Sequence, residues 1–192
     1  ETELKLSFAP RRLGSILGHP RIVGAAPGKT QHLVATYYDT PDLALREAGV
    51  GLRVRKEGER WVQTIKSAAN GRSGLHEREE LDAEVESDAL DLTKLPIQGP
   101  LGELFASADF RRALEPVVVT DVQREIRHLA GPGKLRIEIA VDRGRLRAGK
   151  RSCSIAELEL ELLSGEPGEL FDLALTLADV APLRLQPLNK AE

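Results

Sequence analysis

The chain has 192 residues, of which 41% are hydrophobic and 30% charged, as in a globular domain that buries about 70% of its unfolded surface. Its 27 basic and 30 acidic residues give a net charge of −3, which argues against a general nucleic-acid-binding surface, so an anion site has to be a local cluster of Arg and Lys. The single cysteine, Cys153, excludes an intrachain disulfide and a cysteine-based zinc cluster.

Alternating apolar and polar residues predict strands, and helical spacing of apolar residues predicts helices. The expected strands cover residues 1–8, 33–39, 50–56, 60–67, 75–82, 117–129, 134–141, 155–163 and a short piece at 183–188. Helices are expected at 10–18, in a broken segment at 87–114, and at 166–180. Arg143 and Gly144 are expected to form the turn after 134–141. We therefore predict one domain over residues 1–192, α+β and mainly antiparallel, with about eight strands.

The charged residues of these strands gather on one face of each. In the first strand, Glu1, Glu3 and Lys5 share one face, while Leu4 and Leu6 share the other. The same alternation gives the later strands a polar face with Arg53 and Arg55, Thr64 and Lys66, His76, Arg78, Glu80 and Asp82, Thr120 and Arg124, Lys134, Arg136, Glu138 and Asp142, and Glu157, Glu159 and Glu161.

Two architectures fit this pattern. In one, an open sheet packs its apolar side on helices and leaves the charged side in water. In the other, the sheet closes into a barrel with the charged side inside and the helices outside. Three carboxylates on one face repel one another unless a cation lies among them, and paired arginines attract an anion. A polyanion together with a divalent metal would satisfy both clusters.

A series of short motifs follows one order along the chain. They are E-x-E-x-K at 1–5, YYDTP at 37–41, LRxR at 52–55, T-x-K at 64–66, R-x-E at 78–80, T-x-x-x-R at 120–124, E-x-x-x-D-x-G at 138–144, ELELE at 157–161, and a lysine near the C-terminus at 190. Taken together, the set resembles the CYTH domain, or triphosphate tunnel metalloenzyme family. The resemblance implies a closed eight-stranded triphosphate-tunnel barrel with a charged lumen and helices packed outside.

The resemblance also implies roles for the charged residues. The implied substrate-binding residues, which would grip phosphate oxygens, are Lys5, Arg53, Arg55, Lys66, Arg78, Arg124 and Lys190. The implied metal ligands, for Mg²⁺ or Mn²⁺, are Glu1, Glu3, Glu80, Glu157, Glu159 and Glu161. Lys5, Arg53, Arg55 and Glu159 are the expected catalytic residues. Glu138 and Asp142 are expected in supporting positions.

Within the family, the implied reaction is metal-dependent hydrolysis of inorganic triphosphate (tripolyphosphate) to pyrophosphate and phosphate. Aromatic residues make up only 4% of the chain, which favours this small substrate over thiamine triphosphate or the ATP of an adenylate cyclase. A non-catalytic polyphosphate-binding module is an alternative of another class. Tyr37 and Tyr38 are interpreted as packing and hydrogen-bonding groups, and residues 39–41 as a turn or helix cap.

Within the family, the chain most resembles the bacterial inorganic triphosphatases, and this resemblance implies the expected partners. They are inorganic triphosphate or polyphosphate and a helical CHAD domain, fused or adjacent, with the protein itself a monomer or a homodimer. No apolar run approaches the roughly 18 residues of a membrane span, and no signal peptide is visible. We therefore expect a cytoplasmic protein with no membrane or nucleic-acid partner. Few lysines with abundant Arg, Ala, Leu and Gly indicate a bacterial source.

Overall fold

The computed structural model describes residues 2–66, 75–77, 80–94 and 99–186. Its strands are β1 (Thr2–Ser7), β2 (Ala26–Asp39), β3 (Gly51–Glu57), β4 (Arg60–Lys66), β5 (Leu75–Glu77), β6 (Glu80–Val85), β7 (Glu115–Ala130), β8 (Arg136–Ala148), β9 (Arg151–Ser164) and β10 (Arg184–Leu185). Its helices are η1 (Pro10–Arg12), α1 (Leu13–Leu17), α2 (Pro20–Val23), α3 (Ala44–Glu47), η2 (Leu92–Lys94), α4 (Gly99–Ala106), α5 (Ala108–Ala113) and α6 (Gly168–Ala178).

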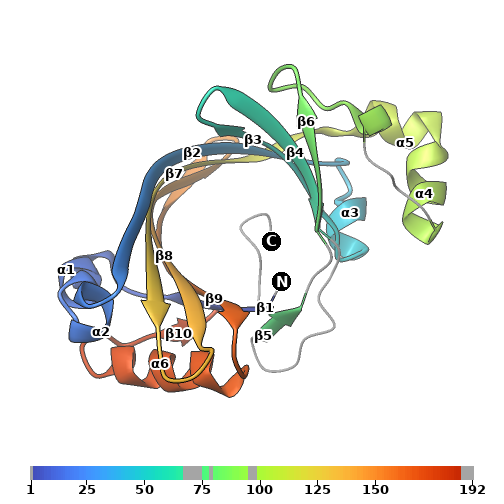
Figure 1. Cartoon of the computed structure of the whole chain (residues 1–192). Coiled ribbons are helices and arrows are strands. Elements are labelled where there is room, and N and C mark those ends of the chain that lie inside the picture. The colour runs from blue at the N-terminus through green and yellow to red at the C-terminus, as the bar shows by residue number, and fades with distance from the viewer. Residues whose placement is uncertain (1, 67–74, 78–79, 95–98, 187–192) are drawn as a thin grey trace.

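All the described strands belong to one antiparallel sheet, in the order β10-β1-β9-β8-β7-β2-β3-β4-β6, with β5 also paired to β1. The sheet curls strongly, so that β1 and β4 approach the same side of the molecule from opposite directions (Figure 1). Helices α1, α2 and α6 lie outside one part of the curve, and α4 and α5 lie outside another (Figure 1). The predicted α+β class with mainly antiparallel strands is confirmed.

The predicted eight-stranded closed barrel is not what the described residues form. The sheet has ten described strands, because the single strand expected at 75–82 is split into β5, which follows β1, and β6, which follows β4. No ladder in the described part of the chain joins β6 to β1 or β5, so the hydrogen-bonded order is open there. Strand β5 pairs with β1 and β6 pairs with β4, so the two short strands do not form one continuous strand.

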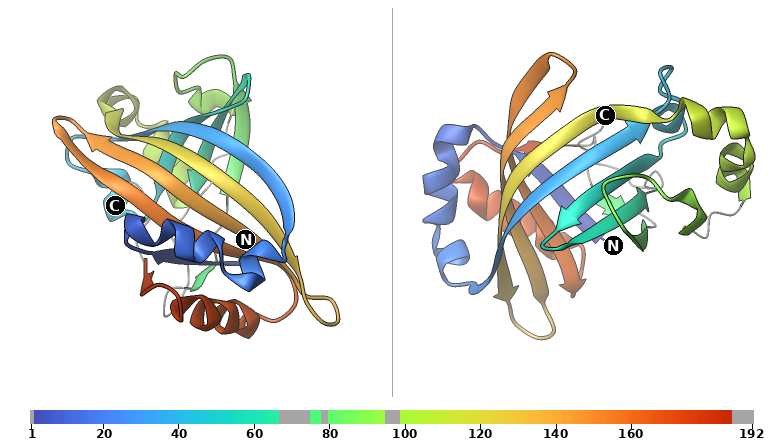
Figure 2. Two further views of the ribbon diagram at one scale, coloured as in Figure 1. Left: turned by 90° about the vertical axis from the view of Figure 1, so that its left-hand side faces the viewer. Right: turned by 90° about the horizontal axis from the view of Figure 1, so that it is seen from above.

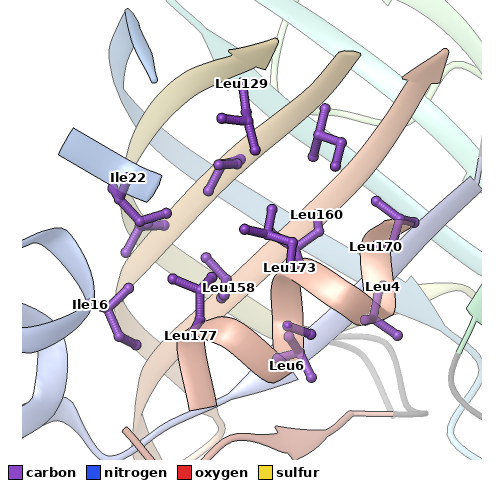
Figure 3. Close-up of a cluster of buried hydrophobic side chains, with 14 of the residues drawn as sticks. Leu4, Leu6, Ile16, Ile22, Leu129, Leu158, Leu160, Leu170, Leu173 and Leu177 are labelled. Carbon is purple, nitrogen blue, oxygen red and sulfur yellow. The ribbon is translucent and has the colours of Figure 1, made fainter. Parts of the chain in front are cut away.

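The main apolar core lies on the outer face of the sheet, under α1, α2 and α6 (Figure 3). Leu158 and Leu160 of β9, with Leu4 and Leu6 of β1, alternate with the charged residues of the same strands and are at most 3% exposed. Helix α6 covers them with the buried side chains of Leu170, Leu173, Ala174 and Leu177. Burial of this outer face leaves the charged face of β1, β8 and β9 turned to the inside of the curve.

A second apolar cluster anchors the other end of the sheet. Leu52 of β3 and Ile65 of β4 pack with Leu45 of α3 and Phe105 of α4. Phe105 and Phe110 meet edge to face, with ring centroids 5.2 Å apart. Since the outer faces of β3 and β4 are occupied in this way, their alternate residues also point inward.

The turn predicted at Arg143 and Gly144 is wrong. Strand β8 runs on to Ala148, and the chain reverses at Gly149, which has a positive φ of 55°. A Cβ at Gly144 would come within 2.0 Å of the Asp121 carbonyl oxygen on β7. The glycine therefore allows a close approach of two strands.

The predicted helices agree with the structure. The helix expected at 166–180 is α6, and the broken segment 87–114 contains η2, α4 and α5. The helix expected at 10–18 is η1 followed by α1. No helix in the described ranges has the length and apolar composition needed to cross a membrane.

We expect Leu177→Ala to lower the free energy of unfolding by about 2–5 kcal/mol, because the side chain is fully buried and its removal leaves a cavity. Leu175→Ala on the same helix is the matched control, since Leu175 is 70% exposed and its loss should cost less than about 0.5 kcal/mol. Urea unfolding measures both. Equal destabilisation would contradict the assignment of α6 as the cover of the outer face.

Candidate functional site

The inner face of the curled sheet encloses a cavity of about 510 Å³, a size typical of small-ligand sites. Eight strands line it, with the residues Glu3 and Lys5, Leu33, Ala35 and Tyr37, Gly51, Arg53 and Arg55, Lys66, Glu80 and Asp82, Thr120, Val122 and Arg124, Asp142, and Glu159 and Glu161. The polar faces expected from the sequence therefore meet in one space, because the sheet curls with those faces inward.

The structure brings together most of the predicted site residues. Lys5, Arg53, Arg55, Lys66 and Arg124 all line the cavity. Among the predicted metal ligands, Glu3, Glu80, Glu159 and Glu161 also line it, and Glu157 lies beside it, opposite Asp142 in the β8–β9 ladder. Glu1, Arg78 and Lys190 lie outside the described residues.

One wall of the cavity is basic. Arg53 and Arg55 project from β3, and the β3–β4 and β4–β6 ladders place Lys66 opposite Gly51 and Glu80. The carboxylate of Glu80 bridges two of these cations, with 3.3 Å from its Oε1 to Arg53 Nη2 and 2.7 Å from its Oε2 to Lys66 Nζ. Arg55 forms an ion pair with Glu57 on the same strand. Each of these cations is mostly buried, so each is held in place before any ligand arrives.

The basic wall keeps its charge. Burial alone would lower the pKa of Arg53, but Tyr37, Glu80 and Asp82 together raise it above its ordinary value. Burial and the neighbouring charge of Arg53 lower the pKa of Arg55, partly offset by Glu57. Arginine stays protonated under such shifts. The Nε of Arg53 is buried with no hydrogen-bond partner among the described residues, which leaves one donor for an anion in the cavity.

The opposite wall is acidic. Arg124 binds Asp142 in bidentate fashion, with 2.7 Å from Nε to Oδ1 and 2.7 Å from Nη2 to Oδ2. Arg124 also contacts Glu159, whose other oxygen lies 3.2 Å from Lys5 Nζ. Burial would lower the pKa of Arg124, but the charges of Glu159 and Asp142 raise it well above its ordinary value. Glu159 thus sits between two cations in the middle of the wall.

Carboxylates outnumber the cations on this acidic wall. Asp142, Glu157 and Glu159 each offer an oxygen, and these oxygens lie within 4.8 Å of one another. Glu3 pairs with Glu161 across β1 and β9, and Glu161 pairs with Glu138 across β9 and β8. Burial, with the charges of Glu138 and Glu3, raises the pKa of Glu161. Buried carboxylate oxygens in excess of their cations are the donor set that a hard divalent ion prefers.

Charge alternation did not reveal the inner face of β2. Leu33, Ala35 and Tyr37 line the cavity together with Val122 of β7, so this part of the wall is mainly apolar. The ladder places Ala35 opposite Arg55 and Tyr37 opposite Arg53. Neither face of β2 carries a run of charge in this region, so alternation could not identify its inner side. The position of Tyr37 within a recognised motif was the available signal.

The other expectations for residues 37–41 agree with the structure. Tyr38 donates a hydrogen bond to the Asp88 carbonyl oxygen, 2.9 Å away, and is a packing residue. Asp39 accepts from the backbone N–H groups of Thr40, Leu45 and Arg46, so it fixes the loop that leads into α3. Asp142, expected only in a supporting position, is fully buried and central to the acidic wall.

We expect the raised pKa of Glu161 to make metal-free protein less stable as pH rises. Between the ordinary pKa of about 4.5 and the higher folded-state value, the folded protein binds a proton that the unfolded chain releases, so the free energy of unfolding falls through this window. Glu161→Gln removes that fall, and its advantage over the unsubstituted protein should grow from pH 4.5 to neutrality in urea unfolding with EDTA. Glu103→Gln, at an exposed position, controls for the loss of a charge. A difference that does not vary with pH would contradict the assignment.

The comparisons with known proteins agree with this geometry. The model of the CYTH domain matches residues 1–192. A protein of Haemophilus influenzae named inorganic triphosphatase is 32% identical over 196 residues, covering 100% of this chain and 53% of that protein. The chain thus spans about half the length of the curated relative that it matches.

Solved structures share the fold at low sequence identity. The HpAC1 protein of Hippeastrum, described with a dominant triphosphatase activity, superimposes with a TM-score of 0.64 at 18% identity, over 99% of this chain and 92% of that one. The PH1012 protein of Pyrococcus horikoshii gives a TM-score of 0.56 at 19% identity, over 100% and 97%. Because the model of the CYTH domain matches all 192 residues, the chain belongs to the CYTH domain family.

Proposed function

We propose that this protein hydrolyses inorganic triphosphate to pyrophosphate and phosphate in a metal-dependent reaction inside the cavity. The observation that carries the proposal is the division of one 510 Å³ cavity into a basic wall and an acidic wall that face each other. The name of the Haemophilus influenzae relative supports the substrate. We further propose that the ring of strands closes in the working enzyme, so that the cavity becomes a tunnel.

The cations of both walls are proposed to bind the phosphate chain. Lys5, Arg53, Arg55, Lys66 and Arg124 line the cavity, and the proposal adds Arg78 and Lys190 from the sequence motifs. Arginine can bind two phosphate oxygens at once, whereas lysine acts as a point charge. Each described cation already contacts a carboxylate, so substrate binding would exchange carboxylate oxygens for phosphate oxygens without unpairing a buried charge.

The acidic wall is proposed to hold Mg²⁺ or Mn²⁺. The proposed ligands on this wall are Glu3, Glu157, Glu159 and Glu161, with Asp142 added because its oxygen gathers with those of Glu157 and Glu159. Glu80, which lies among the cations of the basic wall, and Glu1, from the sequence motif, complete the proposed set. When bound, such an ion supplies charge neutralisation at phosphate oxygens and a more acidic water. The hard carboxylate donors of this group fit either ion.

The chain's own residues perform the remaining steps. Arg53, Arg55 and Lys66 fix the phosphate chain along the basic wall, which orients its terminal phosphorus. Glu159, on the opposite wall, accepts the proton of the attacking water as the new P–O bond forms. The bond between the terminal phosphorus and the bridging oxygen breaks. Pyrophosphate then leaves, and Arg53 and Arg55 balance its negative charge.

A second candidate is hydrolysis of an organic triphosphate. The apolar strip of Leu33, Ala35 and Val122, with Tyr37 beside it, would accommodate a non-phosphate group at one side of the cavity. Phosphate release measured with tripolyphosphate, thiamine triphosphate and ATP, each with Mg²⁺ or Mn²⁺, separates the two candidates. Binding of tripolyphosphate without release would instead favour a non-catalytic polyphosphate-binding module.

We expect Arg53→Ala to lower kcat/KM for tripolyphosphate by two to three orders of magnitude, or about 3–4 kcal/mol of transition-state stabilisation, by analogy with other buried charge stabilisers. Lys94→Ala, at an exposed position away from the cavity, is the control and should retain full activity. Steady-state phosphate release gives both values, with circular dichroism to verify folding. Near-full activity of a folded Arg53→Ala protein would refute the basic wall as the substrate site.

We expect EDTA to abolish turnover and Glu159→Gln to weaken Mn²⁺ binding at least tenfold, because the substitution removes a charged oxygen from the carboxylate group. Glu86→Gln, at an exposed position, should bind Mn²⁺ as the unsubstituted protein does. Isothermal titration without substrate measures this independently of catalysis. Unchanged Mn²⁺ affinity in Glu159→Gln would place the metal elsewhere.

Likeness to the CYTH domain family also supports a proposal about the domain organisation, location and partners of the protein. We propose that residues 1–192 act as one domain in a cytoplasmic bacterial protein, as a monomer or homodimer. A CHAD domain, fused or adjacent, is the proposed companion, with no membrane or nucleic-acid partner.

A further inference from the structure

The hairpin of β8 and β9 carries a basic surface that the cavity does not use. Its end projects past the neighbouring strands in both views of Figure 2, where it is orange. Between residues 143 and 156 the sequence has five cations, Arg143, Arg145, Arg147, Lys150 and Arg151, and no acidic residue. In a chain with a net charge of −3, this concentration of positive charge is local to one element.

Three of the arginines form a regular row. Arg143, Arg145 and Arg147 alternate along β8 with the residues that face the inside of the sheet, so they share its outer face at intervals of about 6.8 Å. Across the β8–β9 ladder, Arg145 lies opposite Ser154 and Arg147 opposite Ser152. All five side chains are exposed. We call these five residues the hairpin face.

Neighbouring elements add to the charge of this face. Helix η1 lies against β9, where the Phe8 N–H donates to the Ala156 carbonyl, and Ala156 is the ladder partner of Arg143. Arg11 and Arg12 of η1 are therefore near the base of the hairpin, and both are exposed. The acidic residue opposite Arg145 on β7 is Asp121, which already contacts His32 at 2.7 Å.

The outer arginines of β8 differ in their pairing from the arginines of the cavity and from Arg127 of β7. Arg124 and Arg127 each contact a carboxylate, as do Arg53 and Arg55 in the cavity. Within the described residues, by contrast, Arg143, Arg145 and Arg147 form no ion pair. A row of unpaired like charges is relieved by a multivalent anion, and arginine favours phosphate geometry.

The composition of the face indicates which polyanion it fits. Proteins that bind single-stranded nucleic acid combine a basic groove with aromatic side chains on which bases stack. Residues 143–156 include no aromatic residue, and the hairpin face offers four guanidinium groups and one ammonium group, with the hydroxyls of Ser152 and Ser154 beside them. We propose that the hairpin face binds a linear inorganic polyphosphate, a chain of phosphates without bases, outside the cavity.

The position of the hairpin face would keep a bound polyphosphate close to the cavity. Asp142 and Arg143 are consecutive residues of β8, one facing the cavity and the other facing outward, so the two sites share a strand. A polymer held on the outer face would stay close to a cavity that accepts phosphate chains. The interaction itself does not require turnover, so it can hold even where the proposed hydrolysis fails.

The test is binding of a linear polyphosphate of several tens of phosphates, titrated at several salt concentrations. In the triple variant Arg143→Thr/Arg145→Thr/Arg147→Thr, we expect the Kd to rise at least tenfold. The slope of log Kd against log salt should fall by about two, as for the loss of three phosphate contacts to a single-stranded polyanion. Threonine keeps the strand propensity. Tripolyphosphate hydrolysis should stay unchanged, and circular dichroism verifies folding.

The matched control is Lys29→Thr/Lys94→Thr/Lys134→Thr, which removes the same charge from three exposed and dispersed positions. Its Kd should stay within twofold. Equal weakening in both triple variants would mean that net charge alone governs binding and would overturn the proposal. Loss of polyphosphate binding in Arg53→Ala/Arg55→Ala, with retention in the hairpin variant, would place the polymer in the cavity instead.

Two further polyanions test the class of ligand. Single-stranded DNA and poly-glutamate of matched length should bind at least tenfold more weakly than polyphosphate at the same salt concentration. Equal or tighter binding of either would overturn the assignment to polyphosphate. Absence of phosphate release with intact polyphosphate binding would refute the proposed hydrolysis and leave the hairpin face supported.

Discussion

Buried charges of both signs on the inner face of one curled sheet are the constraint around which this structure is arranged. A charge removed from water is costly unless it is paired, and here the cations and carboxylates of the cavity compensate one another across strands. Arg124 joins β7 to β8 and β9, Lys5 joins β1 to β9, and Glu80 joins β6 to both β3 and β4. The charged network thus links most of the strands around the cavity.

Such a network contributes little net stability, because desolvation offsets most of the attraction between the charges. Stability comes instead from the outer face, where Leu158, Leu160 and Leu177 are fully buried between sheet and helices (Figure 3). The apolar outer face of the sheet therefore provides stability, and the charged inner face provides the groups that can bind a ligand. The outer face holds the sheet in its curved form, and the curve keeps the charged groups close enough for a ligand to exchange with their present partners.

The acidic wall has more carboxylates than cations, and on the basic wall the buried Nε of Arg53 has no hydrogen-bond partner among the described residues. A metal ion would balance the first and a phosphate oxygen the second, so a metal–triphosphate pair would satisfy both. On the outside, Arg143, Arg145 and Arg147 form no ion pair with any described residue, although they lie on the same strand that supplies Asp142. One strand thus combines a paired inner charge with unpaired outer charges.

The sequence by itself determined which residues share a face of each strand, because the side-chain period of two is a property of the backbone. This is why Glu3 and Lys5, Arg53 and Arg55, and Glu159 and Glu161 could each be placed on the polar face of their strand. The ordered motifs indicated the family. It did not determine which walls meet. The contacts of Glu80 with Arg53 and Lys66, the central place of Asp142, and the apolar inner face of β2 all depend on strand register and curvature. Strand register and curvature also explain why residues 75–82 form two strands, β5 and β6, and why Gly144 lies so close to β7. Register and curvature arise from pairing between residues far apart in sequence, which local periodicity does not encode, so only the tertiary structure decided them.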